Sequence, residues 1–179
     1  MNNKTKKISK EILFSIGFKY LSFFPASSKH FREIMKKKIQ VSYEIYKDPP
    51  LDESYGWLDE IIQKFHQMGL LNDEQFINGS IQTFKNKGLS KKMMHLKLQL
   101  KGIDEKSIDR ALTEINDDDE LFNLFKIMKR KKYGVFSSYQ SWQSDLKQKS
   151  YFARNGFDID LIQKGFSMSL EEALELLNR

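Results

Sequence analysis

The sequence contains no cysteine and only three prolines and nine glycines among its 179 residues. Without cysteine, the chain can form no disulfide, no thiolate metal site and no thiol nucleophile. So few prolines and glycines argue against an all-β protein, whose many turns need these residues. No apolar run approaches the ~18 residues that a membrane-spanning helix requires. We therefore predict a helical protein with no membrane partner, located in the reducing cytoplasm.

The amino-terminal segment needs a separate check, because lysines followed by a short apolar run resemble a signal peptide. Lys19 ends this run after residues 12–18, and no small-residue cleavage site follows. We therefore predict that the chain is not exported.

One short pattern occurs twice in the chain, 54 positions apart. It consists of a polar residue, Gly, an apolar residue and Asp, with further apolar residues four and eight positions after the Asp. The two copies are Lys101–Asp104 with Ile108 and Leu112, and Asn155–Asp158 with Ile162 and Phe166. Repeats of this length are typical of helical arrays, in which each unit buries its apolar face against the next.

The periodicity of apolar residues is helical almost throughout, as at Ile61, Phe65 and Met68. Residues 93–100 fit both a half-buried strand and a helix, and we interpret them as a helix. The predicted fold is all-α: about nine helices in three tandem three-helix repeats that form an elongated, curved array. The repeats cover residues 10–71, 72–116 and 117–179. The first carries an insertion at about 38–57, and the third ends in a short extension.

Local signals support these helices. Four residues stand where a helix N-cap is expected: Asp73, Ser90, Asp104 and Asp158. Four glycines stand where helices are expected to end: Gly69, Gly88, Gly102 and Gly156. Ser169 and Glu172 have the spacing of a capping box before a last helix.

Several motifs, in order along the chain, resemble those of the RecX family of RecA regulators. They are Gly69–Phe76 (GLLNDEQF), Lys87-Gly88-Leu89 with Lys91 and Lys92, Leu98 with Lys101–Ile103, Lys132–Gly134, and Ala153–Phe157. The similarity runs from about residue 12 to 168. The longer first repeat and the tail after Ser169 depart from the shorter family pattern.

The resemblance implies a regulatory protein of tandem three-helix repeats, not an enzyme. Its implied partner is the RecA filament on single-stranded DNA, whose ATPase and strand exchange it would inhibit in DNA repair, recombination and the SOS response. Direct binding of single- and double-stranded DNA is also implied. The resemblance implies no cofactor and no small-molecule substrate.

Charge supplies candidate binding residues. Residues 81–101 carry a net charge of +6 with no acid, residues 102–120 carry −6 and residues 121–154 carry +7. Basic blocks suit a polyanion partner, although ordinary solvated lysines give the same pattern. The predicted DNA- or filament-binding residues are Lys85, Lys87, Lys91, Lys92, Lys97, Lys101, Lys126, Lys129, Arg130, Lys131, Lys132 and Arg154.

Other residues have weaker claims to function. The aromatic residues Tyr133, Phe136, Tyr139 and Trp142 fit either the core or a base-stacking surface. The run Asp117–Glu120 fits a helix N-terminus better than a cation site. The histidines are too dispersed in the sequence to argue for a metal site or a catalytic triad. We predict no catalytic, metal or cofactor site.

Two alternatives stay open at this point. One is a sequence-independent DNA-binding module that acts without RecA. The other is a helical-repeat DNA glycosylase, which would need an enclosed pocket holding Asp109 or Asp145.

Overall fold

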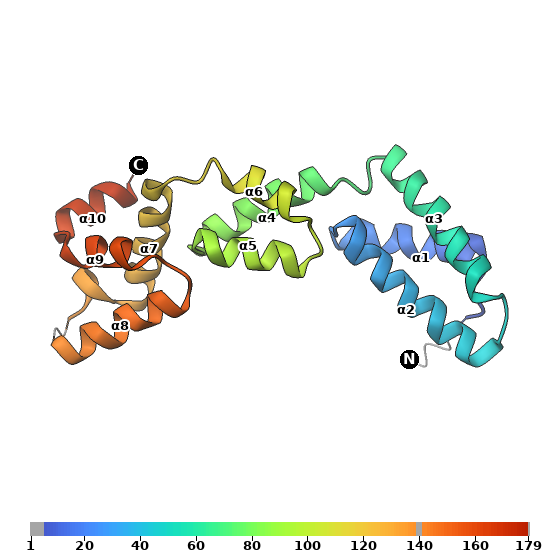
Figure 1. The fold of residues 1–179 in the computed structure, drawn as a ribbon, viewed down its shortest axis with the longest axis horizontal. Helices are drawn as coiled ribbons and strands as arrows, with labels where there is room; N and C mark the ends of the chain where they lie inside the picture. Colours follow the sequence, from blue (N-terminus) through green and yellow to red (C-terminus); the bar gives the residue numbers. More distant parts are fainter. Residues whose placement is uncertain (1–5, 139–140, 179) are drawn as a thin grey trace. The chain divides into compact units, whose positions relative to one another are not determined.

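The computed structural model describes residues 6–138 and 141–178, which contain helices and no strand (Figure 1). This confirms the all-α fold class. The α-helices are α1 Lys10–Phe23, α2 Ser28–Tyr46, α3 Leu51–Gln67, α4 Asp73–Lys87, α5 Lys91–Leu100, α6 Glu105–Leu112, α7 Asp117–Lys131, α8 Trp142–Arg154, α9 Ile159–Ser167 and α10 Leu170–Leu177. A short 3-10 turn, η1, covers Gly134–Phe136. Residues 93–100 lie in α5, so their interpretation as a helix is confirmed.

The helices form two compact units. The first unit comprises α1–α3, the start of α4 up to Phe76, and residues 101–103. The second comprises the rest of α4, α5 up to Leu100, and all helices from α6 onward. The division into three repeats stays a prediction.

The first unit is built on a core of aromatic and aliphatic side chains from three long helices. Phe31 of α2 and Phe65 of α3 are fully buried, with ring centroids 5.7 Å apart in an edge-on arrangement. Helices α2 and α3 have 19 and 17 residues and are joined only by residues 47–50. Residues 38–57, predicted as an insertion, therefore extend two helices and leave a short loop between them.

The core of the second unit centres on Phe152 of α8, which is fully buried. Its ring meets those of Tyr133, Tyr151, Phe157 and Phe166 at centroid distances of 5.4–6.2 Å. The predicted capping box of α10 is present: Ser169 and Glu172 exchange hydrogen bonds between side chain and backbone.

The predicted helix ends are largely confirmed. Ser90, Asp104 and Asp158 accept hydrogen bonds from backbone N–H groups in the first turns of their helices. Asp73 is the exception, because Asn72 caps α4 by accepting from the Gln75 N–H. The Asp73 carboxylate instead accepts from the backbone N–H of Ser28 at 2.7 Å, so it ties α4 to the start of α2.

One polar junction occurs in both units. In the first, the Ser27 hydroxyl donates to the carbonyl of Lys101, and a Cβ on Gly102 would lie 2.9 Å from the Lys29 side chain. The second unit repeats the arrangement with different residues: the Ser90 hydroxyl donates to the carbonyl of Asn155 at 2.7 Å, and Gly156 lies against the stem of Lys92. The repeated pattern of the sequence therefore has a structural counterpart in these two contacts.

Candidate nucleic-acid-binding surface

In the second unit, the end of α4 and the following loop are fixed onto α7. The Asn123 side chain donates to the Leu89 carbonyl at 3.1 Å, and the Lys126 ammonium donates to the Lys85 carbonyl at 3.2 Å. Asn123 is 1% exposed, so this hydrogen bond satisfies a buried amide. The contacts hold the basic segment 85–92 in a defined position beside α7.

The start of α5 is held against α7 in a similar way. The Lys91 N–H donates to the Glu120 carboxylate at 2.8 Å, and the Lys91 ammonium donates to the Ile115 carbonyl at 3.1 Å. Burial raises the pKa of the Glu120 carboxyl above its ordinary value, while the bond from the Lys91 N–H opposes this effect. Nearby Asp117 and Asp158 add smaller contributions that raise the pKa further.

Four of the predicted binding cations are thus engaged within the chain. Lys91 and Lys126 bind carbonyls, Lys85 pairs with Asp119 at 3.6 Å, and the Lys131 ammonium lies 4.9 Å from the Tyr151 ring centroid. Their first role is to join helices of the second unit.

The other eight predicted cations are exposed and form no hydrogen bond or ion pair through their charged groups with the described part of the chain. Seven belong to the second unit: Lys87, Lys92, Lys97, Lys129, Arg130, Lys132 and Arg154. The eighth, Lys101, belongs to the first. Most of the seven lie at the carboxyl ends of α4, α7 and α8, where a cation also offsets the partial negative charge of the helix end.

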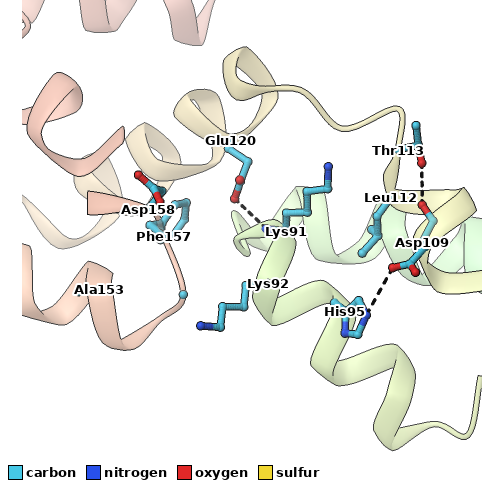
Figure 2. A pocket seen from close by; sticks show the side chains of 11 residues that line it. Lys91, Lys92, His95, Asp109, Leu112, Thr113, Glu120, Ala153, Phe157 and Asp158 are labelled. Atoms are coloured by element: carbon cyan, nitrogen blue, oxygen red, sulfur yellow. Dashed lines mark hydrogen bonds and ion pairs between the residues drawn. The ribbon is translucent and has the colours of Figure 1, made fainter. Parts of the chain in front are cut away.

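A groove of about 630 Å³ is lined by residues of α5, α6, α7 and α8 and of the segments that follow α6 and α8. Its lining residues from the described chain are Lys91, Lys92, His95, Asp109, Leu112, Thr113, Glu120, Ala153, Gly156, Phe157 and Asp158. Figure 2 shows Lys92 extending from α5 toward the connection between Ala153 and Phe157. His95 and Asp109 lie together at another side of the groove. The groove thus combines a free ammonium group with carboxylates.

The raised pKa of Glu120 leads to a pH-dependent prediction. Because this pKa is higher in the folded chain, the folded chain binds the proton more tightly than the unfolded chain does. Stability therefore decreases as pH rises from the ordinary pKa of 4.5 through the raised pKa of the folded chain. We expect Glu120→Gln to raise Tm relative to the wild type at pH 7, and to raise it less at pH 4. Thermal melts at both pH values measure this difference.

Glu172→Gln is the matched control for this prediction. Hydrogen bonds from the backbone and side chain of Ser169 lower the Glu172 pKa, so its contribution to stability is present above pH 4.5 and is lost as pH falls. Glu172→Gln should therefore lower Tm at pH 7 and have less effect at low pH. If both variants changed Tm at pH 7 in the same direction, the opposite pKa shifts assigned to Glu120 and Glu172 would be contradicted.

A second groove, in the first unit, was not predicted from the sequence. It has a volume of about 800 Å³ and an apolar floor that includes Ile8, Ile12 and Ile16. Phe23 and Phe24 at its edge are 70% and 59% exposed. Its charged lining residues from the described chain are all lysines: Lys6, Lys19, Lys37 and Lys38. The sequence feature that could have indicated this basic groove is the net charge of +7 over residues 1–50.

The aromatic candidates separate into two classes. Tyr133 and Phe136 are half-buried against other rings, whereas Trp142 is 73% exposed; Tyr139 lies outside the described residues. The acidic run forms the first turn of α7, with Asn116 and Asp119 completing a capping box, as expected for a helix N-terminus. No helix in the described ranges has both the length and the hydropathy needed to cross a membrane.

The sequence is similar to three curated proteins named "Regulatory protein RecX", among them those of Myxococcus xanthus and Agrobacterium fabrum. The protein of Myxococcus xanthus is 21% identical over 164 residues, which cover 90% of this chain and 87% of the relative. That of Agrobacterium fabrum is 32% identical over 112 residues, or 60% of this chain and 58% of the relative. These matches support assignment of the chain to the RecX family. No family model matches the sequence.

A solved structure has the same fold. The crystal structure of RecX from Lactobacillus salivarius matches with a TM-score of 0.64 and 19% identity, covering 94% of this chain and 96% of the other. The predicted family is therefore confirmed by sequence, and its helical fold by structure.

Proposed function

We propose that the chain binds the RecA filament on single-stranded DNA in the cytoplasm and inhibits its ATPase and strand exchange. The observation that carries this proposal is the set of seven exposed cations on one compact unit that form no ion pair within the described residues, in a chain similar to RecX proteins. The curated relatives are regulatory proteins by name, which agrees with a regulator that has no catalytic site of its own.

The chemistry of these cations suits a polyanion of any sequence. Lysine and arginine side chains without internal partners can neutralise phosphates, but contacts to phosphates carry no base information. The four engaged cations fix α4, α5, α7 and the adjoining rings in position. A binding surface needs a rigid support and exposed groups that can contact a partner. The engaged cations contribute to the support, and the other cations supply the exposed groups.

A glycosylase is less compatible with the geometry. The Asp109 side chain is 67% exposed and pairs with His95, so it does not lie in an enclosed base-sized pocket. Asp145 occupies the first turn of α8, where a carboxylate stabilises the helix N-terminus.

An ATPase assay tests the proposal directly. We expect the chain to inhibit the DNA-dependent ATPase of RecA at concentrations comparable to that of RecA. Raising the salt concentration should relieve the inhibition, because phosphate contacts weaken as salt increases. The RecA filaments should be assembled before salt is added. Failure of the filament to assemble at high salt is then not mistaken for inhibition by the chain. Unchanged ATPase and strand exchange at low salt with excess protein would refute the proposal.

A DNA-binding module acting without RecA is the second candidate. The same free cations support it, because phosphate contacts alone explain DNA binding. Charge-removing variants distinguish the two functions, as discussed below.

A further inference from the structure

We propose that His95, Glu105 and Asp109 form a binding site for a divalent transition-metal ion such as Zn²⁺. His95 lies in α5, while Glu105 and Asp109 lie one turn apart on α6, all within the second unit. The Nε2 atom of His95 is 2.8 Å from Oε1 of Glu105 and 3.7 Å from Oδ1 of Asp109. All three ligand atoms lie within 4.8 Å of one another, and no other trio in the described residues meets this condition.

These distances are close to those that a tetrahedral ion requires. Zinc binds imidazole nitrogen and carboxylate oxygen at about 2.0–2.2 Å, which separates neighbouring ligand atoms by about 3.3 Å. The two distances from Nε2 bracket this value. Glu105 and Asp109 are 57% and 67% exposed, so small side-chain rotations can complete the geometry.

The donor set indicates the class of metal. Magnesium and calcium prefer oxygen ligands alone, whereas an imidazole with carboxylates suits Zn²⁺, Co²⁺ or Ni²⁺. Three protein ligands leave a fourth position for water or for an oxygen atom of a partner. Within the described residues, Nδ1 of His95 has no hydrogen-bond partner, and lack of such support typically weakens metal binding about 10–100-fold. We therefore expect micromolar rather than nanomolar affinity.

Metal binding has two structural consequences. The ion would join α5 to α6, replacing the ion pair between His95 and Glu105 and releasing any proton held on Nε2. It would also offset the charge of Asp109, which lines the same groove as Lys92. The metal site stands on its ligand geometry and does not rest on the proposed RecA function.

Calorimetric titration of the full, tag-free chain with zinc chloride at pH 7 tests the site. We expect one ion per chain with a Kd of about 1–100 µM. His95→Gln and Asp109→Asn should each weaken binding at least ~10-fold. Zinc at a hundred times Kd should raise Tm, and Co²⁺ should give the visible absorption of a tetrahedral complex.

Asp118→Asn is the matched control, since it removes an exposed carboxylate from α7 outside the cluster. Its zinc affinity should equal that of the wild type. The proposal fails if His95→Gln binds zinc as the wild type does, if Asp118→Asn weakens binding as much as Asp109→Asn, or if the wild-type Kd exceeds ~1 mM. If His95→Gln does not fold by circular dichroism, Glu105→Gln and Asp109→Asn decide the outcome, because both replace exposed side chains.

Discussion

Replacement of Lys87, Lys92 and Lys97 by glutamine should lower the affinity for single-stranded DNA about 100-fold at 0.1 M salt. Each phosphate contact on a single strand contributes a salt slope of about −0.7, which corresponds to about a fivefold change in affinity at that salt concentration. Three contacts multiply to about two orders of magnitude. The slope of log affinity against log salt should fall by about 2. Fluorescence anisotropy of a labelled oligonucleotide measures both quantities.

The structure determines which lysines belong in this experiment. Lys91 lies in the same basic segment, but its ammonium binds the Ile115 carbonyl, so its replacement would disturb the fold. Glutamine retains much of the side-chain stem, which matters at Lys92 because its stem packs on Gly156. A control variant with Lys106, Lys147 and Lys164 replaced by glutamine loses the same charge from exposed positions elsewhere on the second unit.

The control should lose no more than about threefold in affinity, through the general electrostatic field alone. Equal losses in the two variants would show that net charge, and not a particular surface, governs binding.

Measuring RecA inhibition with the same variants distinguishes DNA contacts from contacts to the RecA protein. If DNA affinity is lost but RecA inhibition persists, contacts to the RecA protein dominate. If the variant loses both, DNA contacts are required.

Gly88→Ala should destabilise the second unit by about 2–4 kcal/mol. Gly88 has a φ of +74°, in the left-handed region that costs an alanine about 1 kcal/mol. An added Cβ would also lie 2.7 Å from the carbonyl oxygen of Asn123. This oxygen is part of the α7 backbone and cannot rotate away, so the α4–α7 contact must open. The variant should lose protection from hydrogen exchange in α7.

Gly69→Ala is the matched control for this prediction. Gly69 has nearly the same φ, +71°, but a Cβ there would meet no atom within 4 Å. Gly69→Ala should therefore lower the free energy of unfolding only by the cost of placing alanine in the left-handed region, about 1 kcal/mol. Urea unfolding followed by circular dichroism compares the two variants. Equal destabilisation by both would mean that α4 does not approach α7 as closely as the structure shows.

Much of the fold could be predicted from the sequence because its signals are local. The glycine at position 88 and the capping box at Ser169 act within one turn of the chain, and both are confirmed. Asp73 shows the limit of such signals. An aspartate at a helix start is expected to be the cap, but here it bonds the N–H of Ser28, 45 positions away.

The candidate binding surface was less predictable for the same reason. A lysine in a basic segment looks free until its neighbours in space are known. Lys91 and Lys126 find carbonyl partners at Ile115 and Lys85, while Lys92 and Lys97 have none within the described residues. His95 shows the opposite error: isolated from other histidines in the sequence, it lies beside two carboxylates of the next helix.

The junction made by Ser27 in one unit and Ser90 in the other has a consequence for sequence divergence. In both cases the hydroxyl donates to a main-chain carbonyl, at residues 101 and 155. A main-chain acceptor persists whatever side chain the residue carries, and these two positions already differ, one being lysine and the other asparagine. Each junction therefore constrains one serine and one glycine. The side chain of the residue that supplies the carbonyl, directly before the glycine, is free to change. A protein whose helices are joined by such contacts can diverge widely in sequence while the packing between the helices is retained.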